Sequence, residues 1–198
     1  MAALFKELNQ LDQGPMKGNP VVQGIDPSTL GQLEKREALE AVNLIKEKSD
    51  GTLKGRTCGN GSKQQRFLKG DENYALSTVT LVSILITLVI DAYESRDIAI
   101  ADIPGAYLHA LWPENKKVLL KLRGRFVDIM CEVNPEYKNF VIYEGKKKQK
   151  ILYLHLLRVL YGCLESALLW YNLYSKTLKD IGLEVNPYNK CVVNKMIN

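Results

Sequence analysis

The longest apolar stretch of the chain, residues 76–90, limits the folds that can accommodate it. It spans 15 residues and is interrupted by hydroxyl side chains at Ser77, Thr78, Thr80, Ser83 and Thr87. A membrane-spanning helix needs about 20 predominantly apolar residues, so this stretch is too short to cross a bilayer. We therefore expect a helix over residues 79–93 that is buried in a protein core, and we expect no membrane as a partner.

Length and composition are typical of a soluble globular protein. The chain has 198 residues, 46% of them hydrophobic and 25% charged, with a net charge of +5; these values exclude a disordered chain, a collagen or a coiled-coil rod. The cysteines are too widely spaced for a C-x-x-C pair, and the two histidines add no zinc signature, so we expect reduced thiols. The first segment, MAALFKELNQ, lacks the apolar region of a signal peptide, and we predict an intracellular protein.

The order of predicted elements indicates an α+β fold in which helices cover a mostly antiparallel sheet. Residues 1–27 are rich in Gly, Pro, Asn and Gln and are expected to form a loose lead-in. Apolar residues at helical spacing then predict a helix over about residues 30–48. Asp50-Gly51 is expected to end this helix.

Turn signals divide the rest of the chain into short elements. Residues 52–58 are predicted to form a strand that returns through Asn60-Gly61 as a second strand over residues 65–68. The other expected elements are strands over residues 98–103, 118–122, 140–143, 151–155, 183–185 and 191–193, and helices over residues 126–133 and 164–181.

Charge is unevenly distributed along the chain. Residues 71–115 carry seven acidic residues and one basic residue, whereas residues 1–70 and 116–198 are both net basic. An acidic segment between basic flanks suits a site that holds a cation and is surrounded by phosphate contacts. Scattered, solvated surface charge is the alternative interpretation.

Asp102 is the most informative acidic residue. In the predicted strand over residues 98–103, side chains alternate between the two faces, so Asp102 shares a face with Ile98 and Ile100. A carboxylate beside apolar residues is costly unless a metal ion, a cluster of N–H groups or solvent satisfies it. Asp102 is therefore either a metal ligand or a turn-forming residue before the Pro104-Gly105 break.

Four segments carry a pattern that becomes specific when they are taken in order. They are LKGRTCGNGSKQQR (53–66), IADIPGAYLHA (100–110), LYGCLESALLWY (160–171) and GLEVNPYNKCVV (182–193). The first resembles the fingers segment of Ty1/copia-type retrotransposon reverse transcriptases, in which a K-x-R strand precedes a Gly-containing turn, and the second resembles their first catalytic motif. The third and fourth resemble the family patterns L-Y-G-L-K-Q-x-P-x-x-W-Y and G-F-x-x-S-x-x-D-x-C-V-Y.

The resemblance covers roughly residues 30–198 and implies part of a right-hand polymerase. After the lead-in, a partial reverse transcriptase domain would span residues 28–198. Its fingers would lie over about residues 28–95, and a partial palm over about residues 96–198.

The resemblance also implies a chemistry for several residues. Family members transfer nucleotides from a dNTP with two magnesium ions, on an RNA or DNA template-primer. Asp102 matches the first metal-binding carboxylate, and the backbone carbonyl of Ile103 would supply a further Mg²⁺ ligand. Ala106 and Tyr107 match the floor beneath the nucleotide sugar, where the Tyr107 ring would exclude a ribose 2′-hydroxyl.

Four more residues match nucleotide-binding positions of the family. Lys54 and Arg56 match basic fingers positions that contact the triphosphate. Tyr161 and Gly162 match the loop that lines the nucleotide and template pocket. A core aromatic role for Tyr107 and an exposed basic strand at Lys54 and Arg56 are the alternatives.

The chain also departs from the family pattern. Leu164 and Glu165 stand where the family has Lys and Gln, which should weaken phosphate contacts. The Tyr-Val-Asp-Asp hairpin that completes the family's metal site does not occur before Asn198, so we expect weak or absent Mg²⁺ binding and no polymerase activity from this truncated chain alone. A second polypeptide completing the palm is a possible partner.

Two other functions remain open on the sequence. The chain could be a non-enzymatic nucleic-acid-binding remnant that uses its basic fingers, which predicts salt-sensitive binding that survives loss of the Asp102 charge. It could instead be a protein-interaction module that pairs through an exposed palm edge.

Overall fold

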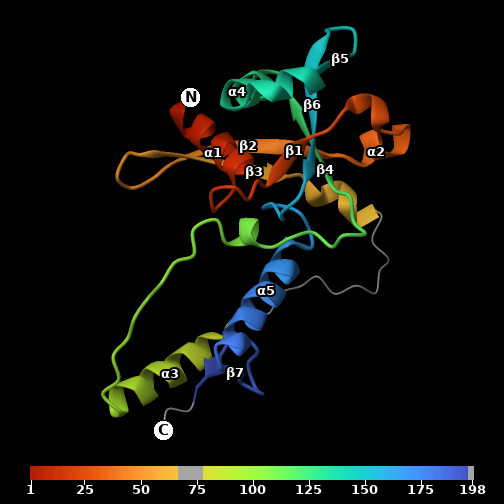
Figure 1. The fold of residues 1–198 in the computed structure, drawn as a ribbon. Coiled ribbons are helices and arrows are strands. Elements are labelled where there is room, and N and C mark those ends of the chain that lie inside the picture. Colours follow the sequence, from red (N-terminus) through yellow and green to blue (C-terminus); the bar gives the residue numbers. More distant parts are fainter. Residues whose placement is uncertain (67–77, 196–198) are drawn as a thin grey trace.

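A six-stranded sheet organises the computed structural model, which describes residues 1–66 and 78–195 (Figure 1). Its strands are β1 (Val22–Gly24), β2 (Leu39–Glu47), β3 (Leu53–Gly59), β4 (Leu119–Arg123), β5 (Ile142–Glu144) and β6 (Gln149–Leu156). The order is β1-β6-β4-β2-β3, with β5 also paired to β6. Only β2 and β4 run parallel, so the sheet is mostly antiparallel.

Five α-helices accompany the sheet in the described part of the chain. They are α1 (Ala2–Gln13), α2 (Gln32–Glu37), α3 (Leu81–Tyr93), α4 (Arg125–Val133) and α5 (Ser166–Asp180), and single 3₁₀ turns lie at Pro27–Thr29, Gly61–Arg66, Ala106–His109 and Pro135–Phe140. A separate pair, β7 (Glu184–Val185) and β8 (Val193–Asn194), follows α5. The predicted α+β class is therefore confirmed, whereas the polymerase architecture and its division at about residue 95 stay predictions.

The core lies on both faces of β4 and β6, because side chains alternate along a strand. Leu152 and Leu154 of β6 belong to the larger cluster, which α1 and α4 cover. Ile151 and Tyr153 point to the other face and pack in a smaller cluster with Ala38 at the end of α2. Both sets are fully buried, so β6 is the centre of the molecule.

The expectation of a loose lead-in over residues 1–27 is wrong. This segment forms α1 and β1, and Leu4, Leu8 and Leu11 of α1 are buried in the larger cluster. These leucines recur at the i, i+4, i+7 spacing of one helical face, a signal that the glycines and prolines nearby obscured. α1 lies along β3 and beside α4 (Figure 1).

The predicted helix over residues 30–48 is also wrong beyond its first turns. The chain is helical only in α2, and then forms β2, which pairs with β3 from Ala41 opposite Gly59 to Glu47 opposite Leu53. Asp50-Gly51 is therefore the turn of a hairpin, with Gly51 at φ +77°. Long-range pairing decided a segment whose apolar spacing suited helix and strand alike.

The strand predicted over residues 52–58 is confirmed as β3, but its predicted return strand is not found. Residues 61–66 form a 3₁₀ turn instead. The rest of that prediction, Phe67 and Leu68, lies outside the described residues.

The helix over the apolar stretch is confirmed as α3, but its burial is not. None of its residues is buried, and it lies away from the sheet, next to β7 (Figure 1). Asn189 Nδ2 donates a 2.8 Å hydrogen bond to Ser83 Oγ. Among the described helices, none is long and apolar enough to cross a membrane.

The strand predicted over residues 98–103 is wrong. These residues are extended toward the sheet but pair with no described strand, and Ile100 is 96% exposed. An alternating segment becomes a strand only where a partner supplies the ladder. Asp102 therefore has no buried strand face behind it.

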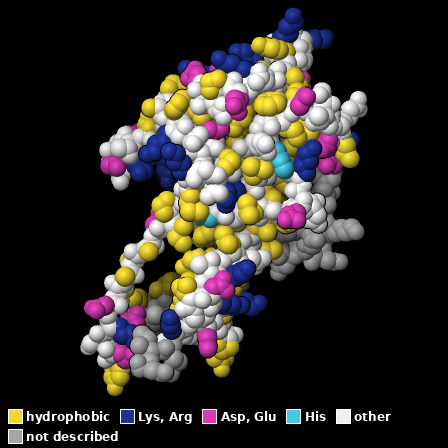
Figure 2. All heavy atoms as spheres, viewed as in Figure 1, with side chains coloured by type: hydrophobic (Ala, Val, Ile, Leu, Met, Phe, Trp, Pro, Cys, Tyr) yellow, Lys and Arg dark blue, Asp and Glu magenta, His cyan; other side chains and the backbone are white. Residues whose placement is uncertain are grey.

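The predicted elements of the C-terminal half are confirmed with small shifts of their ends. β4, α4, the β5-β6 hairpin, α5 and the β7-β8 pair all form where turn residues and periodicity placed them. Gly182, at φ +83°, follows the end of α5. Lys and Arg side chains gather at the tip of the β5-β6 hairpin (Figure 2).

Candidate functional site

Three predicted site residues from distant segments meet at one place. Arg56 comes from β3, Tyr107 from the 3₁₀ turn at Ala106–His109, and Tyr161 from the loop after β6. The Tyr107 and Tyr161 ring centroids lie 4.7 Å apart with a tilt of 47°. The Arg56 guanidinium carbon lies 5.1 Å from the centroid of the Tyr161 ring, within range of a cation–π interaction. We call Arg56, Tyr107 and Tyr161 the aromatic-arginine cluster.

Lys54 adds a second cation near this cluster. It precedes Arg56 by two residues on β3, so both side chains leave the same face of the strand. Both are exposed, and both act electrostatically on the carboxyl of Glu7. The pair therefore presents two positive charges to solvent.

Glu7 is a site residue that sequence reasoning missed. It belongs to α1, which packs against β3, and its Oε1 accepts the Thr57 N–H at 2.8 Å. Burial raises the pKa of Glu7, while the Thr57 N–H and the charges of Arg56 and Lys54 partly oppose that shift. The Glu7 carboxylate thus interacts electrostatically with both Lys54 and Arg56. The only sequence signal was the leucine periodicity that places Glu7 on α1.

Gly162 positions the loop that carries Tyr161. The Gly59 N–H donates to the Tyr161 carbonyl at 2.7 Å, which brings the end of β3 against this loop. Gly162 has φ +85°, and a Cβ added there would lie 2.3 Å from the Gly59 carbonyl oxygen. Only glycine fits such a conformation and approach. Gly162 therefore shapes the site by its backbone.

Asp102 lies within electrostatic range of the cluster. Burial raises the pKa of Tyr161, Arg56 lowers it, and the charges of Tyr107, Glu7 and Asp102 raise it further. Asp102 is exposed, Ile103 is 38% exposed, and Ala106 is half-buried in the turn beside Tyr107. Gly105, at φ +63°, starts that turn. Asp102 and Tyr107, the two ends of this segment, thus both act electrostatically on Tyr161.

The oxygen donors near Asp102 fit Mg²⁺ only in part. In the part of the chain that the structure describes, no three His, Cys, Asp or Glu side chains group together as a metal site. Asp102 and the Ile103 carbonyl offer two oxygen donors. Mg²⁺ in phosphate-transfer sites commonly takes one or two carboxylates together with substrate phosphates and water. These two donors are too few to complete the coordination of Mg²⁺ without phosphate and water oxygens.

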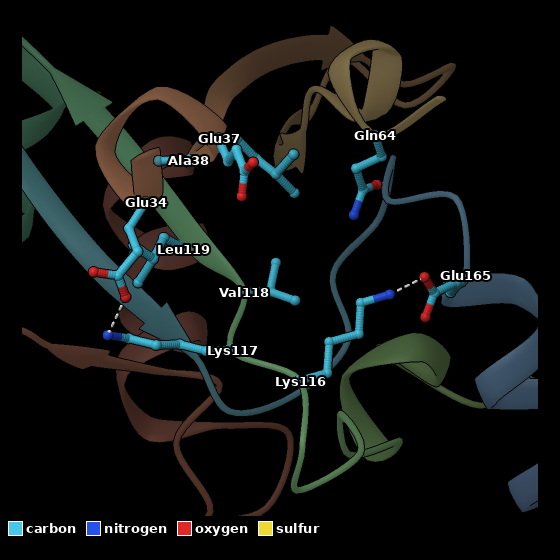
Figure 3. Close-up of a pocket in the computed structure, with 10 residues that line it drawn as sticks. Glu34, Glu37, Ala38, Gln64, Lys116, Lys117, Val118, Leu119 and Glu165 are labelled. Carbon is cyan, nitrogen blue, oxygen red and sulfur yellow. Dashed lines mark hydrogen bonds and ion pairs between the residues drawn. The ribbon is translucent and has the colours of Figure 1, made fainter. Parts of the chain in front are cut away.

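Leu164 and Glu165, which stand where the family pattern has Lys and Gln, interact with residues outside the cluster. The Leu164 N–H donates to Gln64 Oε1 at 3.0 Å, which ties the loop to the 3₁₀ turn after β3. Glu165 is buried and pairs with Lys116. Both residues therefore hold the loop in place, and Glu165 lines a cavity on its other side (Figure 3).

Comparisons of the chain with protein-family models, with curated proteins and with solved structures each give no match.

Proposed function

We propose that the chain is the fingers and partial palm of a Ty1/copia-type RNA-directed DNA polymerase, and that the aromatic-arginine cluster binds the deoxynucleoside triphosphate. The observation that supports this proposal is the convergence of Arg56, Tyr107 and Tyr161, which lie 51 to 105 residues apart along the chain. Each of the three matches a nucleotide-binding position of the family. A chance arrangement of surface residues has no reason to bring these three together.

Each residue of the proposed site has a physical role. Lys54 and Arg56 attract the triphosphate, and the Tyr161 ring holds the Arg56 guanidinium in place. Tyr107 packs against Tyr161, which supports a role of this ring in excluding a 2′-hydroxyl. Magnesium, held by Asp102 and the Ile103 carbonyl, would neutralise phosphate charge and activate the attacking hydroxyl. Two-metal catalysis needs further carboxylates, so we propose that polymerase activity requires residues beyond those described or a partner chain that supplies them.

The proposal is tested by equilibrium binding of a deoxynucleoside triphosphate and of its ribose counterpart, in the presence of Mg²⁺. We expect tighter binding of the deoxy form and loss of this preference in Tyr107→Ala. We expect about 10- to 100-fold weaker binding of both in Arg56→Gln, since hydrogen bonds to charged groups contribute about 1.5–3 kcal/mol. Lys146→Gln, in the exposed turn between β5 and β6, is the matched control. Absence of saturable binding by the native chain would overturn the proposal.

The nucleic-acid-binding remnant predicts different results in the same assay. Single-stranded RNA or DNA would bind with strong salt dependence, free nucleotides would not bind, and Asp102→Asn would have no effect. Charge reversal at Lys54 and Arg56 would abolish that binding.

A protein-interaction module is a second candidate, favoured by the exposure of α3. Leu81, Val82 and Val89 are 65–68% exposed, and hydrophobic side chains reach the surface along the arm that carries this helix (Figure 2). Contiguous exposed apolar surface promotes association. We expect sedimentation to show concentration-dependent association of the native chain and a monodisperse monomer for the Val82→Lys/Val89→Lys variant. A monomeric native chain would exclude self-association through α3.

A further inference from the structure

A cavity of about 260 Å³ is lined by Glu165 of the 161–165 loop, and no residue of the aromatic-arginine cluster lines it. It opens between α2, the beginning of β4, the 3₁₀ turn after β3 and the beginning of α5 (Figure 3). Its floor is apolar and consists of Ala38, Leu39, Val118 and Leu119, each 2–6% exposed. The cavity therefore has an apolar floor, and polar side chains surround its opening. These are Glu34, Glu37, Gln64, Lys116, Lys117 and Glu165, which we call the rim.

Both lysines of the rim are neutralised by glutamates on the walls. Lys117 Nζ lies 2.7 Å from Glu34 Oε1, and Glu34 Oε2 accepts the Gly31 N–H at 2.8 Å. Lys116 pairs with Glu165 at the opposite side. Figure 3 shows each pair as a separate link at the edge of the cavity. Neither ammonium group is therefore free to attract an anion.

Glu37 is the remaining charge of the rim. Its carboxylate points into the cavity (Figure 3) and makes no hydrogen bond or ion pair with any side chain that the structure describes. The amide of Gln64 also points inward, and its Oε1 is occupied by the Leu164 N–H. With three glutamates and two lysines, the lining has a formal charge of −1, within a chain of net charge +5.

We propose that this cavity binds a compact organic cation, an alkylammonium or alkylguanidinium group, whose charged head pairs with Glu37 and whose stem lies on the apolar floor. The apolar floor favours a cation with a hydrocarbon stem over a hydrated metal ion, because burying that stem removes apolar surface from water. A single unpaired carboxylate is also too few ligands for a divalent metal. A cavity of about 260 Å³ has room for one long basic side chain. This inference is independent of the proposed nucleotide site.

The same chemistry can come from a free amine or from an arginine side chain of a polypeptide, and the experiment separates the two. Backbone amide shifts of the native chain are followed by NMR during titration with agmatine and, separately, with a capped arginine tripeptide. We expect saturable shifts at Ala38, Leu39 and Leu119 with at least one of the two ligands. Agmatine alone would indicate a free amine as ligand, and the peptide alone would indicate a partner side chain.

The variant Glu37→Gln keeps the shape of the side chain and removes its charge. We expect about 10- to 100-fold weaker binding, since hydrogen bonds to a charged group contribute about 1.5–3 kcal/mol. Glu132→Gln, which removes an exposed carboxylate of α4 away from the cavity, should bind as the native chain does. Unchanged thermal melting of both variants controls for folding. The proposal is overturned if neither ligand produces saturable shifts, or if Glu37→Gln binds as tightly as the native chain.

Discussion

Replacing Gly162 with alanine tests whether the loop that carries Tyr161 is held by a backbone approach only glycine permits. Gly162 has φ +85°, where an L-residue is disfavoured by about 1–2 kcal/mol. The added Cβ would also lie 2.3 Å from the Gly59 carbonyl oxygen, a backbone atom that cannot rotate away. Relief of this clash would separate the two segments and break the 2.7 Å hydrogen bond from the Gly59 N–H to the Tyr161 carbonyl, about 0.5–1.5 kcal/mol.

We therefore expect Gly162→Ala to lower the free energy of unfolding by about 1.5–3.5 kcal/mol, the sum of backbone strain and the lost hydrogen bond. Gly18 supplies a matched control, because its φ is +86° and a Cβ there would meet nothing within 4 Å. Gly18→Ala should cost only the conformational part, about 1–2 kcal/mol. Urea unfolding at equal m-values measures both variants. Equal losses in the two variants would refute the proposed close approach between the loop and β3.

Three further predictions concern side chains of the site and the core. Glu7→Gln keeps an oxygen that can accept the Thr57 N–H and removes the negative charge near Lys54 and Arg56. We expect triphosphate affinity, measured by calorimetry, to increase about two- to fivefold. Unchanged or weaker affinity would contradict competition between the Glu7 carboxylate and the triphosphate. Tyr137→Phe removes the buried 2.7 Å hydrogen bond to Asp12; we expect a loss of about 1–2 kcal/mol in urea unfolding, whereas Tyr143→Phe, at an exposed position of β5, should change little. Glu144 accepts a 2.9 Å hydrogen bond from Lys121, whose side chain is 8% exposed. Burial raises the pKa of Glu144, but Lys121 and Tyr153 lower it by more. The pKa of Glu144 is therefore below its ordinary value of 4.5. Because the pKa of Glu144 is lower in the folded than in the unfolded state, its contribution to stability is complete above about pH 4.5 and is lost as pH falls through the folded-state pKa. In that pH range the native chain should lose stability more steeply than Glu144→Gln. Parallel pH profiles of the two would contradict the pairing of Glu144 with Lys121.

The elements that could be predicted from the sequence are those with local signals. The β5-β6 hairpin alternates on either side of a turn rich in Lys, and α5 has helical periodicity followed by Gly182, so neither needs a distant partner to be recognised. β2 could not be distinguished from a helix, because its conformation depends on pairing with β3 and β4. Residues 98–103 lack such partners: their alternating pattern predicts a strand, but no described strand pairs with them.

The candidate site was predictable in its residue types and only partly in its geometry. Arg56, Tyr107 and Tyr161 match positions in the motifs of the resembled family, and the structure brings their side chains together. Glu7 was missed because its position behind β3 follows from the packing of α1, which no local pattern near Arg56 reveals. Glu37 was missed for the same reason, since its cavity exists only where α2 meets β4 and α5.

The central proposal is that Arg56 and Tyr161 act together in binding a deoxynucleoside triphosphate. A double-mutant cycle measures this most directly, with triphosphate affinity determined for the native chain, Arg56→Gln, Tyr161→Leu and the double variant. The 5.1 Å contact between the guanidinium and the ring predicts a coupling energy of about 0.5–1 kcal/mol. Additive effects of the two substitutions, or no saturable binding by the native chain, would contradict it.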